Sequence, residues 1–243
     1  MHGMFALEIW NRRARRLILA RNRIGKKPLY YAATADTFLF GSEIKALLTW
    51  PGPPRATDLS AIDRYVTWGY MPTLYTAFKG IRKLAAAHYL RRGAYRRLHG
   101  VGVRPLLASP PRGGTAIIEL RCELAEQLEN PMRLRMASDV PLGAFLSGGV
   151  DSFAVVAMMA RIAGGTVKTF SKWVFGKKHN ETGYARMAAQ RYAIEHQELV
   201  AEPDAVAVLP RLVWHYGEPF ADPIRDADLL PLPGGASNGD RRT

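Results

Sequence analysis

The chain has 243 residues, 48% of them hydrophobic and 23% charged, with 34 Lys and Arg against 21 Asp and Glu. This composition excludes a disordered chain and is sufficient for one or two globular domains. No run of about 18 apolar residues occurs, and the start lacks the apolar core of a secretion signal, so we expect a cytoplasmic protein without a membrane span. A single cysteine, Cys122, cannot form an internal disulfide, which agrees with that location.

The net charge of +13 allows two interpretations, a partner made of nucleic acid or an anionic small molecule. The arginines are scattered along the chain, and aromatic and basic residues do not alternate as they do in RNA-binding modules. We therefore expect a solvated basic surface, and nucleic-acid binding remains the less favoured alternative.

The first fifty residues contain alternating apolar stretches separated by turn residues, which predicts strands followed by a helix. The strands are expected at residues 16–20, 28–33 and 37–41. A short helix follows from Ser42, whose hydroxyl is a suitable N-cap. Residues 51–58 contain three prolines and one glycine, and this composition predicts a linker with a domain boundary after residue 52.

The middle of the chain predicts two helices separated by loops. Asp58 can cap a helix in which Leu59, Ile62 and Val66 share one face. Residues 91–114 are rich in Arg, Gly and Pro, which indicates loops. A second helix is expected from residue 115, and Pro131 should end or kink it because proline lacks the N–H group.

From residue 143 onward, short apolar segments alternate with longer amphipathic ones. Strands are expected at 143–147, 166–175 and 196–200, and helices at 152–163, 181–193 and 203–216. Alternation at these lengths predicts βαβ units, and therefore an α/β fold with a parallel sheet.

The segment 146–152 reads LSGGVDS and lies between an expected strand and an expected helix. Glycines allow the backbone to approach an anion, and the helix N-terminus adds donors and a positive dipole end. Asp151 would repel a bare phosphate, so its presence suggests a divalent cation between the two. The segment therefore predicts a pyrophosphate site with a magnesium ligand, while an ordinary glycine-rich turn with Asp151 as a helix cap remains the alternative.

The Ser-Gly-Gly-x-Asp-Ser pattern resembles the pyrophosphatase loop of enzymes that adenylate a substrate. Its flanks are similar to the synthetase domain of glutamine-dependent asparagine synthetases, in the stretches SDVPLGAFLSGGVDS, KTFS, YARMAAQRYAIEHQELV and LVWHYGEPFADP. Upstream, residues 3–32 and 38–48 resemble the end of that family's glutaminase domain, and residues 62–90 the start of its synthetase half.

The resemblance implies an α/β fold whose parallel sheet is of the adenine-nucleotide alpha-hydrolase (ATP pyrophosphatase) type, preceded by a small β remnant of a glutaminase domain. The implied division is 1–52 for the remnant, 53–223 for a partial ATP-binding domain and 224–243 for an unassigned tail. The implied activity uses ATP and Mg²⁺ to convert aspartate to β-aspartyl-AMP, which ammonia then converts to asparagine.

Carried over by motif, the resemblance assigns two groups of residues. The implied ATP and pyrophosphate contacts are Leu146, Ser147, Gly148, Gly149, Asp151, Ser152 and Lys172, with Asp151 also holding the metal. The implied acceptor-site residues are Glu195, His196, Glu218 and Asp222. Lys172 departs from the small or apolar residue that is usual there, and His196 has the alternative of a surface residue at the start of a strand.

Two departures concern the ends of the sequence. Residue 2 is His2 rather than the family's nucleophilic cysteine, so we expect no glutamine hydrolysis by the family mechanism. After residue 223 the family's Gly-Asp-Gly-x-Asp-Glu loop does not follow, which a reading-frame shift near residue 224 would explain. Three functions stay open: a degenerate amide ligase, an amidotransferase with another acceptor, and a non-catalytic nucleotide-binding fragment that associates with an intact homologue.

Overall fold

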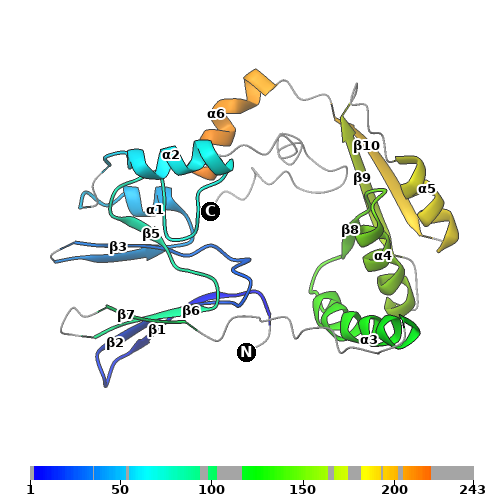
Figure 1. Cartoon of the computed structure of the whole chain (residues 1–243), viewed down its shortest axis with the longest axis horizontal. Coiled ribbons are helices and arrows are strands. Elements are labelled where there is room, and N and C mark those ends of the chain that lie inside the picture. The colour runs from blue at the N-terminus through cyan, green and yellow to red at the C-terminus, as the bar shows by residue number, and fades with distance from the viewer. Residues whose placement is uncertain are drawn as a thin grey trace. The chain divides into compact units, whose positions relative to one another are not determined.

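The computed structural model describes residues 3–34, 36–52, 55–93, 98–102, 117–163, 167–174, 182–192, 194–201 and 205–219. These residues form two compact units, which are considered separately (Figure 1). The first unit lies within Met1–Ser109 and Leu209–Pro223, and the described part of the second lies within Pro110–Val208.

The first unit contains two antiparallel sheets. The four-stranded sheet has the order β1 (Ala6–Asn11), β2 (Arg16–Arg21), β6 (His88–Arg92), β7 (Leu98–Gly102). The three-stranded sheet has the order β4 (Phe38–Gly41), β3 (Tyr30–Ala33), β5 (Ile81–Lys83). The expected strands β2, β3 and β4 are confirmed, whereas β7 lies where we expected only loops. Its residues pair with those of the preceding strand β6 over five positions, although the composition of this stretch indicated loops.

The two sheets share one apolar core, and helices cover the three-stranded sheet (Figure 1). Leu19 and Leu90 of the larger sheet pack with Leu29 and Leu84. A second cluster joins the smaller sheet to α1 (Ile44–Leu48) through its buried residues Ala32, Ile81, Ile44 and Leu47. The first unit is therefore layered as sheet, sheet and helix.

The helix α2 (Leu59–Trp68) begins where its sequence predicts. The Asp58 side chain accepts a hydrogen bond from Ala61 N, and Gly69 ends the helix with φ +74°. The N-cap of α1 is Glu43, without a side-chain bond, so the expectation for Ser42 was wrong. The helix starts one residue later than the serine hydroxyl would require.

Our expected boundary after residue 52 does not coincide with a division between the compact units. The strands β5 and β6 follow that point, yet they pair with β3 and β2, which precede it. Ile81 also lies in the same buried cluster as Ala32. The proline-rich segment is thus a connection inside the first unit, because hydrogen bonding and apolar packing both cross it.

The second unit contains a parallel sheet with the order β10 (Glu195–Ala201), β9 (Lys168–Val174), β8 (Gly143–Phe145). The helices α3 (Ile117–Met136), α4 (Val150–Ala163) and α5 (Thr182–Arg191) accompany it. This arrangement confirms the predicted α/β class and the parallel sheet. Leu146, Val156, Ala185 and Ala188 form its core and join the strand end to α4 and α5.

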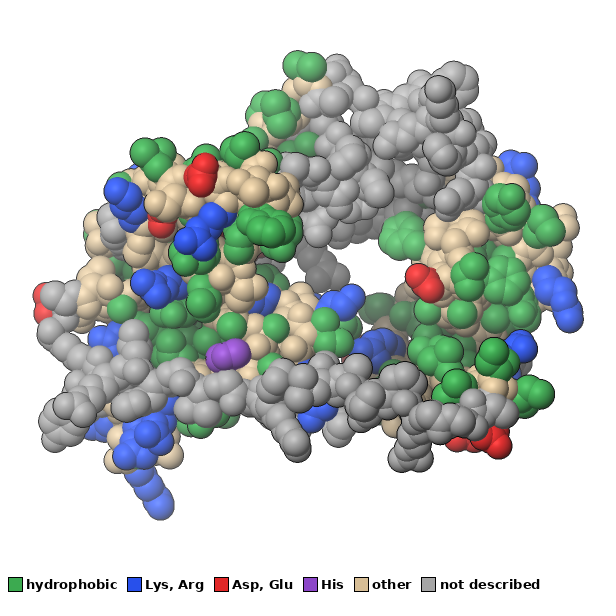
Figure 2. Space-filling model, in the orientation of Figure 1, with side chains coloured by type: hydrophobic (Ala, Val, Ile, Leu, Met, Phe, Trp, Pro, Cys, Tyr) green, Lys and Arg blue, Asp and Glu red, His purple; other side chains and the backbone are tan. Residues whose placement is uncertain are grey.

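Two of the described helices continue past a proline. The helix α3 does not end at Pro131 but extends to Met136, and α6 (Ala205–Tyr216) contains Pro210. Hydrophobic side chains gather on the surface around α3 and α4 (Figure 2), and none of the residues of α3 is buried. Cys122 of α3 is exposed. Among the described helices, none combines the length and the apolar character that a membrane span requires.

Candidate functional site

The candidate site begins at Leu146, directly after β8. Its backbone N–H donates to Phe170 O at 2.9 Å, and its carbonyl accepts a hydrogen bond from the Ser171 hydroxyl. Its side chain is 1% exposed in the core. The start of the loop is therefore fixed by β9, and only the second lone pair of the Leu146 carbonyl remains for the expected contact with adenine.

A hydroxyl network closes the turn between β8 and α4. Ser147 Oγ and Ser152 Oγ lie 2.8 Å apart, and Ser152 Oγ reaches the carbonyls of Ser147 and Gly149 at 2.8 and 2.9 Å. Gly149 N also approaches Ser147 Oγ, at 3.4 Å. The structure thus brings together the predicted residues Ser147, Gly149 and Ser152 in one turn at the carboxyl end of the sheet, where ligands bind in open α/β folds.

The turn leads directly into the N-terminus of α4, which begins at Val150. The first N–H groups of a helix have no partner within it, and the helix dipole makes this end positive. Phe153 N donates to Gly149 O at 3.1 Å, which closes the first turn of the helix. The backbone amides before Phe153 are therefore the donors that suit an anion at this position.

Asp151 lies exposed in the first turn of α4 and fits the implied magnesium ion in a limited way. Mg²⁺ is commonly bound by one or two carboxylates together with the phosphates of a nucleotide. Within the described part of the chain, no group of three or more His, Cys, Asp or Glu side chains is placed to hold a metal. Asp151 therefore fits a metal ion that binds together with a phosphorylated substrate. The described residues do not provide a complete set of metal ligands without it.

Lys172 lies on β9 beyond Phe170, which makes the last pair with β8. Its backbone is thus at the same end of the sheet as Ser147. Its register partner is Leu199 of β10.

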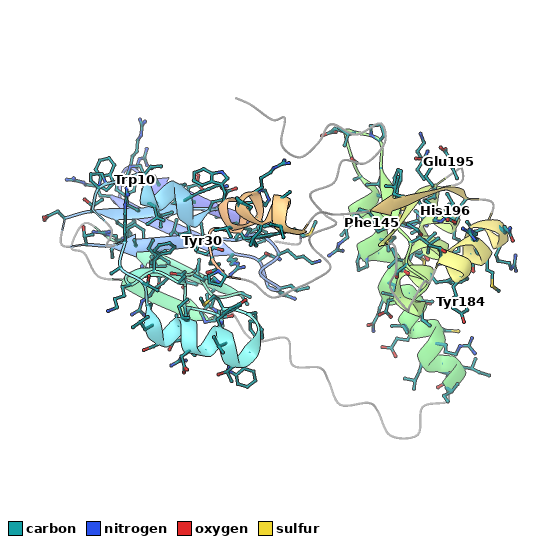
Figure 3. The ribbon with its side chains drawn as sticks, turned by 90° about the horizontal axis from the view of Figure 1, so that it is seen from above. Trp10, Tyr30, Phe145, Tyr184, Glu195 and His196 are labelled. Carbon is teal, nitrogen blue, oxygen red and sulfur yellow. The ribbon has the colours of Figure 1, made fainter. Side chains whose placement is uncertain are left out.

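Glu195 and His196 project from opposite faces of β10, as successive residues of a strand must (Figure 3). Glu195 is exposed, whereas the His196 side chain is only 8% exposed. The alternative of a surface histidine was therefore wrong, because the side chain is covered and contacts Thr169 of β9. The two residues do not form a joint side-chain site on one face of the sheet.

His196 is held by a buried threonine. Its Nδ1 lies 2.9 Å from Thr169 Oγ1, and Thr169 is fully buried. Its Nε2 is buried without a hydrogen-bond partner among the described residues. Burial lowers the pKa of His196 below its ordinary value, with the Glu198 carboxylate opposing this effect. The imidazole is therefore neutral at physiological pH.

An ion pair beside His196 was missed in the sequence. Arg186 of α5 donates two hydrogen bonds to Glu198 of β10, at 2.5 and 2.7 Å. These bonds hold the pKa of Glu198 below its usual range. Glu198 Oε1 lies 4.0 Å from His196 Nε2. The two-residue spacing of His196 and Glu198 places them on one face of a strand, so their proximity could have been predicted. The contribution of Arg186 from α5 could not be predicted from neighbouring residues.

The other two acceptor candidates are Glu218 and Asp222. Glu218 belongs to the first unit, where its Oε1 accepts a hydrogen bond from Lys83 Nζ at 2.5 Å. Burial raises the pKa of Glu218, and Lys83 partly opposes the rise. Asp222 lies outside the described residues. The acceptor role of all four residues stays a prediction.

Comparisons with known proteins agree with the motifs. Residues 1–98 match the family described as glutamine amidotransferase domain, and residues 123–232 match the family described as asparagine synthase. Asparagine synthetase (glutamine-hydrolyzing) 1 of Bacillus subtilis is 29% identical over 229 residues, which are 92% of this chain and 35% of that protein. Asparagine synthetase (glutamine-hydrolyzing) 3 of the same organism is 31% identical over 162 residues, 66% of this chain and 26% of the relative.

A relative with another name is also similar. Amidase chry2 of Gibberella zeae is 29% identical over 204 residues, 82% of this chain and 28% of its own length. The chain thus spans only about a third of the length of the curated relatives that it matches. The two family matches and the similarity over most of the chain show that it belongs to the asparagine synthetase family.

Proposed function

We propose that this chain carries the nucleotide site of an ATP-dependent amide ligase of the asparagine synthetase type. The observation that supports the proposal is the turn from Ser147 to Ser152, which places hydroxyl groups and helix N-terminal amides at the carboxyl end of a parallel sheet. This arrangement suits the pyrophosphate part of ATP. The sheet would then be of the adenine-nucleotide alpha-hydrolase type.

In the proposed reaction, an oxygen of the aspartate side-chain carboxylate attacks the α-phosphorus of ATP, and pyrophosphate leaves. The carboxylate thereby becomes an acyl adenylate with AMP as a good leaving group. Ammonia attacks the acyl carbon, AMP leaves with the bonding electrons, and the surplus proton of the nitrogen passes to solvent. The products are asparagine, AMP and pyrophosphate.

Each residue of the turn has a role in this proposal. The hydroxyls of Ser147 and Ser152 and the amides near Gly149 bind the departing pyrophosphate, because these donors lie in one turn at the N-terminus of α4. Asp151 would hold Mg²⁺, which when bound offsets the negative charge of the phosphates. The backbones of Leu146 and Lys172 would border the adenine.

The test is pyrophosphate release from ATP in the presence of aspartate, ammonium and Mg²⁺, with Ser147→Ala and Asp151→Ala as matched variants. We expect release that depends on aspartate and that both substitutions reduce. Calorimetric titration with Mg·ATP separates binding from turnover. Heat without pyrophosphate release would indicate the non-catalytic nucleotide-binding alternative, and no heat at millimolar nucleotide would contradict the proposal.

A second candidate is an amidotransferase that acts on another acceptor. It is favoured by the similarity to a protein named as an amidase, and by the separation of Glu195 and His196 on opposite faces of β10. Replacing aspartate in the same assay by other carboxylic acids distinguishes the two candidates. Release that another acid supports and aspartate does not would select the second.

A further inference from the structure

The segment 209–219 folds with the first unit, although it lies within the asparagine synthase match of residues 123–232. It comprises most of α6 and the turn that follows. Leu212 of this segment is 6% exposed. Gly217 ends the helix with φ +67° and donates its N–H to Val213 O at 3.0 Å. This left-handed turn directs the chain to Glu218.

Glu218 makes a buried ion pair with a residue 135 positions away in the sequence. Its Oε1 lies 2.5 Å from Lys83 Nζ, and the two side chains are 13% and 16% exposed. The other carboxylate oxygen is buried without a hydrogen-bond partner among the described residues. The carboxylate therefore depends on Lys83 to compensate its buried charge.

The residue beside the pair, Tyr30, does not compete with Glu218 for the charge of Lys83. Lys83 of β5 lies opposite Tyr30 of β3 in the sheet. Burial, with a contribution from Glu218, raises the pKa of Tyr30 to about 12, so its phenol stays neutral and adds no competing negative charge. Tyr30 also lines a pocket together with Ile44, His215 and Gly217, which brings β3, α1 and the end of α6 to one place.

A second contact attaches the same segment. Lys45 of α1 lies over the ring of Trp214, with its Nζ 5.4 Å from the ring centroid. A Cβ added at Gly217 would lie 3.8 Å from Ile44 Cβ, so the turn passes close to the start of α1. Trp214 is 70% exposed and Lys45 is also paired with Glu43, so this cation–π contact lies at the surface, and the ion pair of Lys83 and Glu218 is the buried contact of the segment.

We infer that residues 209–219 form a docking strap, and that Lys83 and Glu218 are the latch that fastens it to the first unit. This segment docks on a surface formed by Tyr30, Ile44, Lys45 and Lys83. Lys45 contacts the ring of Trp214, and Lys83 pairs with Glu218 in the turn after the helix. Glu218 is then a structural residue of the first unit, in which it pairs with Lys83. This inference goes beyond the proposed function and does not depend on it.

The test uses hydrogen–deuterium exchange on the full chain without nucleotide. The variants are Lys83→Met, Glu218→Gln and the double variant Lys83→Met/Glu218→Met, and the exposed Lys79→Met serves as the control. Either single variant should speed exchange in residues 209–217 by at least about ten-fold, because it leaves one buried group unpaired or unsatisfied. The double variant should restore most of the protection, because it removes both charges.

The outcomes separate the latch from an acceptor role. If the pair is a latch, Lys83→Met and Glu218→Gln should both speed exchange in residues 209–217. The two substitutions lie in regions of the chain that match different families. Exchange in residues 209–217 that matches the control in both single variants would overturn the inference. The inference would also be overturned if residues 209–217 of the wild-type protein exchanged as fast as an unstructured peptide. If the single variants prove globally unfolded, circular dichroism shows it, and protection in the double variant then decides.

Discussion

Ser147 Oγ lies 2.8 Å from Ser152 Oγ, so that two hydroxyls five residues apart close the turn between β8 and α4. Ser152 Oγ has one proton and three oxygen neighbours, namely Ser147 Oγ and two backbone carbonyls. A phosphate oxygen can replace any of these acceptors without leaving the hydroxyl unpaired. The turn is therefore ordered before a ligand binds and still has a proton to offer it.

Replacing Ser152 by Ala should weaken Mg·ATP binding more than replacing Ser147. Ser152→Ala removes both the ligand donor and the bonds that order the turn, whereas Ser147→Ala leaves the two carbonyl contacts intact. We expect a loss of about ten-fold or more, which corresponds to roughly 1.4 kcal/mol. Calorimetry measures it, with the exposed Ser60→Ala of α2 as control. Equal affinities of all three variants would contradict a role for the hydroxyls.

Gly149→Ala should separate folding from phosphate binding. An added Cβ would lie 3.4 Å from Ser147 Oγ, an ordinary contact, so the free energy of unfolding should change by less than about 0.5 kcal/mol. The methyl group would obstruct the approach of an anion to the backbone amides, and Mg·ATP affinity should fall. Gly143→Ala is the matched comparison, because its Cβ would lie 2.7 Å from Phe170 Cε2 and should lower the melting temperature. Undiminished affinity of Gly149→Ala would show that no ligand approaches this amide closely.

The second unit should lose stability below about pH 6.5 because of His196. Its folded pKa is lowered, so between that pKa and about 6.5 the unfolded chain binds more protons than the folded one. The contribution is complete above about pH 6.5 and is lost as the pH falls towards the folded pKa. Thermal unfolding from pH 7.5 to 5.5 measures it, and His196→Asn should have a flatter profile. Parallel profiles for the two proteins would rule the explanation out.

Pro131→Ala should stabilise α3. The helix continues through Pro131, which cannot donate the backbone hydrogen bond of that position. The gain should be up to about 3 kcal/mol if the helix forms fully in solution. Chemical denaturation followed by circular dichroism measures it, with Met132→Ala as control. An unchanged midpoint would mean that α3 is already broken at the proline.

Arg21→Met should destabilise the first unit. The Arg21 guanidinium donates to the carbonyls of Lys27, Leu84 and Gly25 at 2.8, 2.6 and 2.6 Å. Without it, three carbonyls lose a charged donor, at a cost of about 2–4 kcal/mol. Thermal unfolding checks the loss, with Arg23→Met as the exposed control. A loss no larger than that of the control would show that water replaces the guanidinium fully.

Features fixed by neighbouring residues were predictable from the sequence. The strand β2 and the turn at Ser147 follow from local apolar and glycine patterns, and the cap at Asp58 follows from the residue type alone. Of the predicted face formed by Leu59, Ile62 and Val66, Ile62 packs against the buried cluster that contains Ala61, whereas Leu59 and Val66 are exposed. Helical periodicity therefore identified the helix but only part of the face that packs.

Features fixed by distant residues were not predictable. The strand β5 pairs with β3 and β6 pairs with β2, and both partners are remote in the sequence. The strand β7 pairs in turn with β6. The same reason explains the proline-rich segment, which marks a connection and not the limit of a compact unit. Arg186 and Glu198 meet because α5 packs on β10, and single-sequence patterns contain no information on that contact.

The ion pair between Lys83 and Glu218 has a consequence for biosynthesis. During synthesis Lys83 is added long before Glu218, and most of the second unit lies between them in the sequence. The first unit therefore cannot form this ion pair until that part of the second unit has been synthesised. During that interval Lys83 lacks its carboxylate partner. Docking of residues 209–219 on the first unit therefore also requires closure of a long intervening segment of the chain, which has an entropic cost.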